Sequence, residues 1–500
     1  MSARAELYGC TEQAACRVDS SSAGVRTAGG ASRPRLVELP HDSILSLGYD
    51  WSRVGDPAVR PKYPAKVYLP RSIEDIAAAV RETRQFGQTL RIRGSGHSSN
   101  DLVVEDGGAI LWTKLFNAVV DVDLAEATVT VQSGAMLAGV EEMLGELGYG
   151  LPVLGDHQHL TAGGFASVGG VSPASHREGM FVDNVLAVEI VGWDGAVRRL
   201  ARGTDALELN RILGGMGRHG IIATLTLRIV AIDKRTTVVR NRRHITFDMA
   251  KFIERSRANI ESDDDVLYQH AIWDERTVLG QTVTFGQCSA YTPTRQSVWK
   301  RLRERVAFGG LHALRNLAGR LPAGLGRVAN TLSGLGFLLP PRFATARNIE
   351  SFTEKVVDHT VGDPVRFYAA LAPMSTYGAL FRELHAIATR YRDEHGCLTS
   401  ISLYVVGLRS PWLAADERER HCDLLLYLGV VPEAMTSARV DALAREVDAA
   451  CIRHGAFRYM HSRTSSDPAI RARIDPNARH EARIRQEASA DPAAKPAANA

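Results

Sequence analysis

Short strand signals alternate with helix signals between Tyr63 and Val230, and this alternation constrains the fold more than any other feature. A strand pattern at 67–69 precedes Ser72, which can cap a helix with Asp75 at the capping-box position. Two hairpin patterns follow, VVDVDLAEATVTVQSGA and NVLAVEIVGWDGAVRRL, the second with an Asp-Gly turn. This part of the chain therefore predicts an α+β domain.

The pattern changes between about 235 and 445, where longer mixed segments predict a second domain built from a sheet with helices on one face. Both ends of the chain lack periodicity and are polar or rich in small residues, which is typical of disorder. We therefore expect a disordered arm at 1–40, a first domain at 41–235, a second domain at 236–445 and a disordered tail at 481–500.

Charge and cysteine content exclude several classes of function. The 500 residues include 60 Lys and Arg against 56 Asp and Glu, so a net charge of +4 provides no basic stripe for nucleic acid. The six cysteines show neither a C-x-x-C pair nor zinc-like spacing with His, which argues against a metal site or a disulfide framework. No secretory or membrane-spanning apolar run is visible, so we expect a cytoplasmic protein.

A formal G-x-G-x-x-G pattern at 215–220 is in the wrong context for a dinucleotide-binding turn. It follows a helical stretch and precedes a strand, whereas the fingerprint requires a strand first and then a helix that meets the pyrophosphate. The sequence therefore disfavours a nicotinamide enzyme, and it contains no Walker A motif.

Small residues concentrate in a turn at 91–101, directly after a predicted strand. They let the backbone approach a ligand, and successive N–H groups in such a turn form a nest for phosphate oxygens. A tight surface turn with an idle histidine is the alternative. The candidate phosphate-binding residues of this turn are Gly94, Ser95, Gly96, His97 and Ser98.

A second segment, at 155–171, combines glycines with Thr and Ser hydroxyls. So many small residues suit a segment that lies flat against a large planar cofactor. An ordinary glycine-rich loop is the alternative.

Taken in order, five motifs resemble the FAD-binding domain of the vanillyl-alcohol oxidase/p-cresol methylhydroxylase (PCMH-type) superfamily, with cytokinin dehydrogenase and alditol oxidase as the most similar members. The motifs are YPAKVYLPRSIEDIAAAVR, RIRGSGHS, DHQHLTAGGFAS, DNVLAVEIVGWDG and LGGMGRHGII, and they span about residues 60–230. The resemblance implies a PCMH-type FAD domain of two subdomains, an α+β substrate (cap) domain with an antiparallel sheet, and a segment at 446–480 that returns to the FAD domain.

The resemblance also implies which residues bind FAD. His97 would attach covalently to the flavin, while the small residues around it would cradle the diphosphate. Because His157 occupies the position of the second attachment residue of some members, a single attachment is expected. The remaining cofactor contacts would be Asp156, Thr161, Gly163, Ser167, Val171 and Ile222.

The catalytic residues are inferred from the same resemblance. Asp156 matches the active-site aspartate of cytokinin dehydrogenases and could accept a proton when hydride leaves the substrate; a turn residue is the alternative. Tyr268 stands where those enzymes place a second acid, which argues against cytokinin as substrate. His461, beside Tyr459, lies in a stretch similar to the strand that returns to the flavin, and a core position is the alternative. His157 and His159 are further candidates for the base.

These expectations describe a flavoenzyme that oxidises a CH–OH or CH–NH group of a small molecule and passes the electrons to O₂ or another acceptor. Two rivals are a membrane-associated lipid-linked sugar oxidase and a flavin-binding partner subunit without turnover. The basic amphipathic stretch at 298–328 could contact an anionic membrane, although a cap-domain helix pair with a solvated face is favoured.

Overall fold

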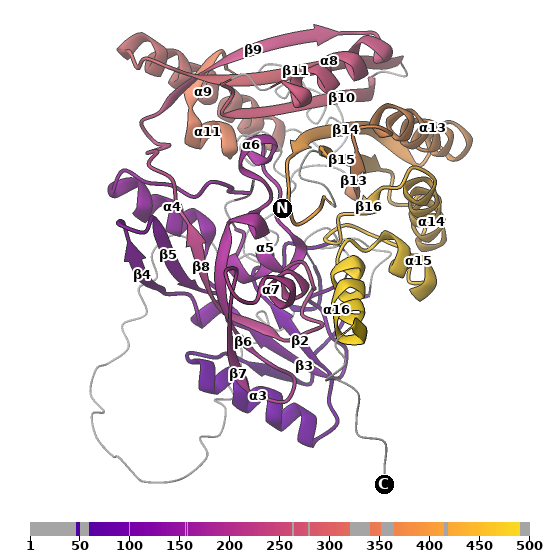
Figure 1. Cartoon of the computed structure of the whole chain (residues 1–500). Coiled ribbons are helices and arrows are strands. Elements are labelled where there is room, and N and C mark those ends of the chain that lie inside the picture. The colour runs from indigo at the N-terminus through magenta and orange to yellow at the C-terminus, as the bar shows by residue number, and fades with distance from the viewer. Residues whose placement is uncertain are drawn as a thin grey trace.

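The computed structural model describes residues 47–50, 60–99, 101–155, 157, 159–262, 265–278, 281–320, 341–351, 365–414 and 419–490. Three sheets organise these residues (Figure 1). Two belong to the domain formed by the first half of the chain, and an eight-stranded sheet forms the second domain. This confirms the predicted α+β architecture with an antiparallel sheet in the cap domain.

The first sheet is parallel, in the order β1-β3-β2, and helix α3 packs on it. The Ser72 hydroxyl accepts a hydrogen bond from the Asp75 amide at 3.1 Å, and the Asp75 carboxylate accepts one from the Ser72 amide at 3.2 Å. This capping box is the one that the sequence predicts. The elements are β1 (Lys66–Tyr68), α3 (Ile73–Gln85), β2 (Leu90–Arg93), β3 (Ala109–Trp112) and a 3₁₀ turn (Thr113–Leu115).

The second sheet has five antiparallel strands in the order β4-β5-β8-β6-β7. Both predicted hairpins form, as β4-β5 and β6-β7, and apolar residues of α4, α5 and α7 pack with this sheet in one core. The elements are β4 (Val119–Asp123), β5 (Thr128–Gln132), α4 (Leu137–Glu146), α5 (Ala162–Val168), α6 (Ser175–Glu178), a 3₁₀ helix (Phe181–Asn184), β6 (Val185–Val191), β7 (Val197–Ala201), α7 (Ala206–Ile212) and β8 (Ile221–Arg228).

The cap sheet is antiparallel, in the order β12-β9-β11-β10-β14-β15-β13-β16. Side chains alternate along its strands, so one face packs with α8, α13 and α14 in the largest core, while the other face is free to meet the first domain. The elements are β9 (Val238–Thr246), α8 (Met249–Glu261), β10 (Tyr268–Val278), β11 (Gln281–Thr294), α9 (Val298–Arg320), β12 (Phe343–Thr345), α11 (Ala346–Glu350), β13 (Val365–Pro373), α13 (Tyr377–His395), β14 (Leu398–Leu408), β15 (His421–Val430), α14 (Ser437–Arg453) and β16 (Phe457–Arg458).

The chain end returns to the first domain through α15 (Pro468–Ile474) and α16 (Ala478–Ala490), and Figure 1 shows α16 beside α7. The expectation of a disordered tail at 481–500 is therefore wrong for 481–490. Glu481 anchors this helix by accepting a hydrogen bond from His219 at 3.1 Å, a long-range contact that local composition does not encode. The expected arm at 1–40 and residues 491–500 lie outside the described residues.

Helix α9 covers residues 298–320 of the basic stretch, and 321–328 lie outside the described residues. One face of α9 is buried, since Glu304 accepts hydrogen bonds from the Thr345 amide and hydroxyl at 2.7 and 3.0 Å. The exposed side of α9 carries apolar residues beside Arg303 and Arg305, with Trp299 74% exposed and Val306 68% exposed. Membrane contact through this stretch stays a prediction.

Candidate flavin and substrate site

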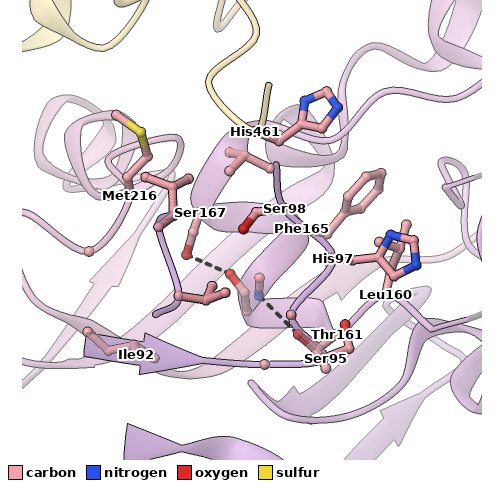
Figure 2. Close-up of a pocket in the computed structure, with 18 of the residues that line it drawn as sticks. Ile92, Ser95, His97, Ser98, Leu160, Thr161, Phe165, Ser167, Met216 and His461 are labelled. Carbon is pink, nitrogen blue, oxygen red and sulfur yellow. Dashed lines mark hydrogen bonds between the residues drawn. The ribbon is translucent and has the colours of Figure 1, made fainter. Parts of the chain in front are cut away.

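A cavity of about 500 Å³ lies where the two sheets of the first domain meet the cap sheet (Figure 2). Segments that are far apart in the sequence line it, including the turn at 91–99, the glycine-rich segment at 160–173 and the segment at 216–222. The structure brings together all the described residues that were predicted to bind the cofactor, namely Gly94, Ser95, Gly96, His97, Ser98, Thr161, Gly163, Ser167, Val171 and Ile222.

Hydrogen bonds to neighbouring strands hold the first turn in place. The Trp112 indole N–H donates to the Gly94 carbonyl at 3.0 Å, and the Thr113 hydroxyl donates to the Arg93 carbonyl at 3.3 Å. Gly94 lies so close to the second segment that a Cβ atom at this position would stand 2.2 Å from the Thr161 hydroxyl oxygen. Glycine is therefore required there because the two cavity-lining segments touch.

The second segment forms the short helix α5 at the cavity wall. The Thr161 hydroxyl caps it by accepting a hydrogen bond from the Gly164 amide at 3.3 Å, and the Ser167 hydroxyl donates to the Gly163 carbonyl at 2.7 Å (Figure 2). A Cβ atom at Gly163 would lie 2.6 Å from the Cβ atom of Ser133. The small residues of this segment thus serve close packing within the wall as well as access to a ligand.

Buried polar atoms on the cavity wall without a hydrogen-bond partner within the described part of the chain include Ser98 Oγ, Ser133 Oγ and His461 Nδ1. Buried polar groups are rarely left unsatisfied, so these atoms indicate a ligand with several polar groups. Together with the close glycine contacts, they fit a flavin dinucleotide, which combines a flat ring system with a polar ribityl and diphosphate chain.

The segment at 215–220 also reaches the cavity, although the sequence excludes it as a Rossmann turn. It follows α7 and precedes β8, as predicted. Met216 and Gly217 both adopt positive φ angles, +53° and +76°, and both line the cavity with Arg218. Gly217 suits this left-handed conformation, whereas Met216 is strained there, which is common where a backbone approaches a ligand.

Three histidines from distant segments converge on the cavity. The His97 and His157 rings have centroids 4.5 Å apart, and both residues line the wall. His461 lies near His157 and stacks edge-on to Tyr459, with centroids 4.1 Å apart. Burial lowers the pKa of His461 to about 3, and the charge of Arg458 adds to this, so its imidazole is neutral at neutral pH.

The remaining predicted site residues are not among the described residues that line the cavity. Asp156 lies outside the described residues, and His159 is not among those that line the cavity. Tyr268 is not among them either. It lies 1% exposed in a separate apolar cluster with Tyr291 and Phe308, where burial raises its pKa well above 10. This position does not suit contact with a substrate, because cap-domain packing covers that end of β10.

Five cap-sheet residues that the sequence analysis did not identify also line the cavity. They lie on the sheet face turned away from the helices, where strand alternation places every second side chain. The sequence contains one signal that could have indicated this face: a charged residue, Asp423, begins the otherwise apolar segment DLLLYLGVV. The five residues are Phe367, Tyr404, Val406, Asp423 and Leu425.

Among the described residues, no cluster of three or more His, Cys, Asp or Glu side chains could hold a metal ion. In the same part of the chain, no helix combines the length and the apolar character that a membrane span needs.

Comparison with known proteins points to one family. Residues 64–201 match the family described as "FAD binding domain". The chain is 34% identical over 168 residues to an uncharacterized oxidoreductase of the fasciation locus in Rhodococcoides fascians, covering 34% of this chain and 38% of that protein. It is 28% identical over 167 residues to L-gulonolactone oxidase of Bos taurus, covering 33% and 38%, and 25% identical over 209 residues to cytokinin dehydrogenase 3 of Arabidopsis thaliana, covering 41% and 39%. The matches thus span about two fifths of these relatives.

Proposed function

We propose an oxidoreductase function for this chain, whose residues 64–201 match the FAD-binding domain family. The chain would remove hydride from a CH–OH or CH–NH group of a small molecule. The observation that carries this proposal is the cavity in which glycine-rich FAD-domain segments meet aromatic side chains of the cap sheet. The names of the relatives, which include oxidases and dehydrogenases, support the same reaction class.

The lining residues form two groups, one that would bind the cofactor and one that would bind the substrate. Gly94, Ser95, Gly96 and Ser98 would hold the diphosphate, and the segment at 161–171 would hold the flavin. When bound, FAD supplies a two-electron acceptor for hydride. The cap-sheet side chains Phe367 and Tyr404, together with His461 and Tyr459, would position the substrate and exclude water.

Anaerobic mixing with a panel of small alcohols and amines tests the proposed function. We expect the purified protein to be yellow and at least one compound of the panel to bleach its visible absorption, with the colour returning when air is admitted. Loss of colour reports the arrival of two electrons at the flavin. A protein that contains no flavin and takes up none from added FAD would refute the proposal, whereas bound flavin that no compound reduces would favour the partner subunit without turnover.

Covalent attachment through His97 is a separate prediction. Acid precipitation of the wild type should leave the yellow colour in the pellet, because a covalent bond survives denaturation. The His97→Ala variant should keep its fold but release all its flavin into the supernatant. The His159→Ala variant is a matched control, since His159 does not line the described cavity; its colour should stay in the pellet. Wild-type flavin that appears wholly in the supernatant would contradict covalent attachment and leave FAD binding intact.

A further inference from the structure

Asp423 is the one carboxylate among the described residues that line the cavity. It lies on β15 and is 6% exposed. Its neighbours in sequence, Cys422 and Leu424, point into the helix-covered core of the cap domain. Strand alternation therefore turns the Asp423 side chain away from that core, toward the cavity and the FAD domain.

The strands beside Asp423 offer it apolar neighbours. Across the sheet it pairs in register with Val406 of β14 and Leu371 of β13. Because the Asp423 side chain is largely buried, its carboxylate interacts more strongly with a cation than it would in water, where solvent dipoles screen the charge.

The same wall of the cavity carries three aromatic rings, those of Phe367, Tyr404 and Tyr459. Aromatic faces attract cations, and an ammonium group is the usual organic cation of small metabolites. The basic residues that line the described cavity, Arg91 and Arg218, belong to the FAD domain rather than to the cap wall. Since the imidazole of His461 is neutral as described above, the cap wall, as far as the structure describes it, offers one carboxylate together with aromatic faces.

We propose that Asp423 binds the ammonium group of an amine substrate and selects amines over carboxylic acids. The assignment rests on the proposed oxidoreductase function and narrows it to the CH–NH class. The Asp423 carboxylate would also accept one ammonium proton. In that step an N–H bond breaks, an O–H bond forms on the carboxylate, and the electron pair stays on nitrogen, so that the neutral amine is ready for oxidation at its neighbouring carbon.

Calorimetric titration of the flavin-loaded protein with three probes of equal shape tests this assignment. The probes are benzamidine, which is a cation, benzamide, which is neutral, and benzoate, which is an anion; none carries an oxidisable C–H bond next to nitrogen. We expect the wild type to bind benzamidine at least about tenfold more tightly than benzamide, and benzoate least tightly. A tenfold difference corresponds to about 1.4 kcal/mol, which a charge-assisted hydrogen bond to the carboxylate would supply.

The Asp423→Asn variant should bind benzamidine about 10- to 100-fold more weakly, while its affinity for benzamide stays within about twofold. The matched control is Asp265→Asn, because the Asp265 side chain also belongs to the cap domain but is 92% exposed; both affinities should match the wild type. Unchanged flavin absorption would show that each variant is folded.

Three results would overturn the assignment: equal benzamidine affinity in Asp423→Asn and wild type, tighter wild-type binding of benzoate than of benzamidine, or no binding of benzamidine at all. Each of these would leave the oxidoreductase proposal standing if the protein carries FAD and a compound of the panel bleaches it. Conversely, a protein without FAD would refute the oxidoreductase function, whatever the probes show.

Discussion

The Lys234→Met variant should lose about 3–5 kcal/mol of unfolding free energy, because the substitution removes the cation from a buried charge cluster. Lys234 is 3% exposed. Its ammonium group lies 2.9 Å from both carboxylate oxygens of Glu350 and 3.6 Å from one carboxylate oxygen of Glu141. It also donates a hydrogen bond to the Leu151 carbonyl at 2.5 Å. Without it, two buried glutamates would face each other uncompensated.

This cluster also joins the two domains, since Glu141 belongs to α4 and Glu350 to α11. Urea unfolding followed by far-UV circular dichroism would measure the loss. The matched variant Glu350→Gln should cost less, because it removes one of the two like charges. A Lys234→Met protein as stable as the wild type would show that the cluster does not hold the domains together.

The pH dependence of the Lys234→Met defect follows from Glu350. Burial raises the pKa of Glu350 from its ordinary 4.5 to about 7, so the folded state holds this proton more tightly than the unfolded state does. The contribution of Glu350 to stability is therefore largest below about pH 4.5 and declines as the pH rises toward 7. Without the positive charge of Lys234, which lowers the pKa of Glu350, the Glu350 carboxylate gains its proton even more readily. The defect should consequently be larger at pH 8 than at pH 5.

Replacing Arg458 with methionine should also cost about 3–5 kcal/mol. Arg458 and its partner Asp448 are both fully buried, and the guanidinium ion-pairs with the carboxylate. Arg458 further donates to the Ala369 carbonyl at 2.8 Å and to the Arg463 carbonyl at 2.6 Å. The substitution would leave the Asp448 charge without its buried partner and would remove the guanidinium donors of both carbonyls, although the Ala369 carbonyl keeps its hydrogen bond from the Tyr459 amide at 3.0 Å.

The loss of Arg458 should also disturb the cavity, because Tyr459 and His461 lie one and three positions after it and line the wall. Flavin content per protein, measured beside the urea midpoint, would report this second effect. Arg463→Met serves as the control, since Arg463 is only partly buried and pairs with the half-exposed Asp441. Its cost should stay below about 1 kcal/mol. Equal stabilities of the two variants would contradict the buried-pair argument.

The sequence by itself determined the short-range structural features of the first domain. The capping box at Ser72, the Asp-Gly hairpin and the small residues around His97 depend on neighbours within a few residues, and the structure contains all three where they were predicted. Turn chemistry and capping act over such short distances that a single sequence encodes them. The order of the motifs then gave the resemblance to an FAD-binding domain, and residues 64–201 match that family.

Only the tertiary structure decided which cap-domain residues meet the cavity. The apolar run of β15 is visible in the sequence, but it does not show whether the side chain of Asp423 faces solvent, a core or a ligand. Tyr268 illustrates the same limit, because the sequence predicts a sheet in this part of the chain but not that the position of Tyr268 on β10 lies under cap-domain packing. The strand pattern sets which residues share a face, whereas long-range pairing and the docking of one domain on another set what that face touches.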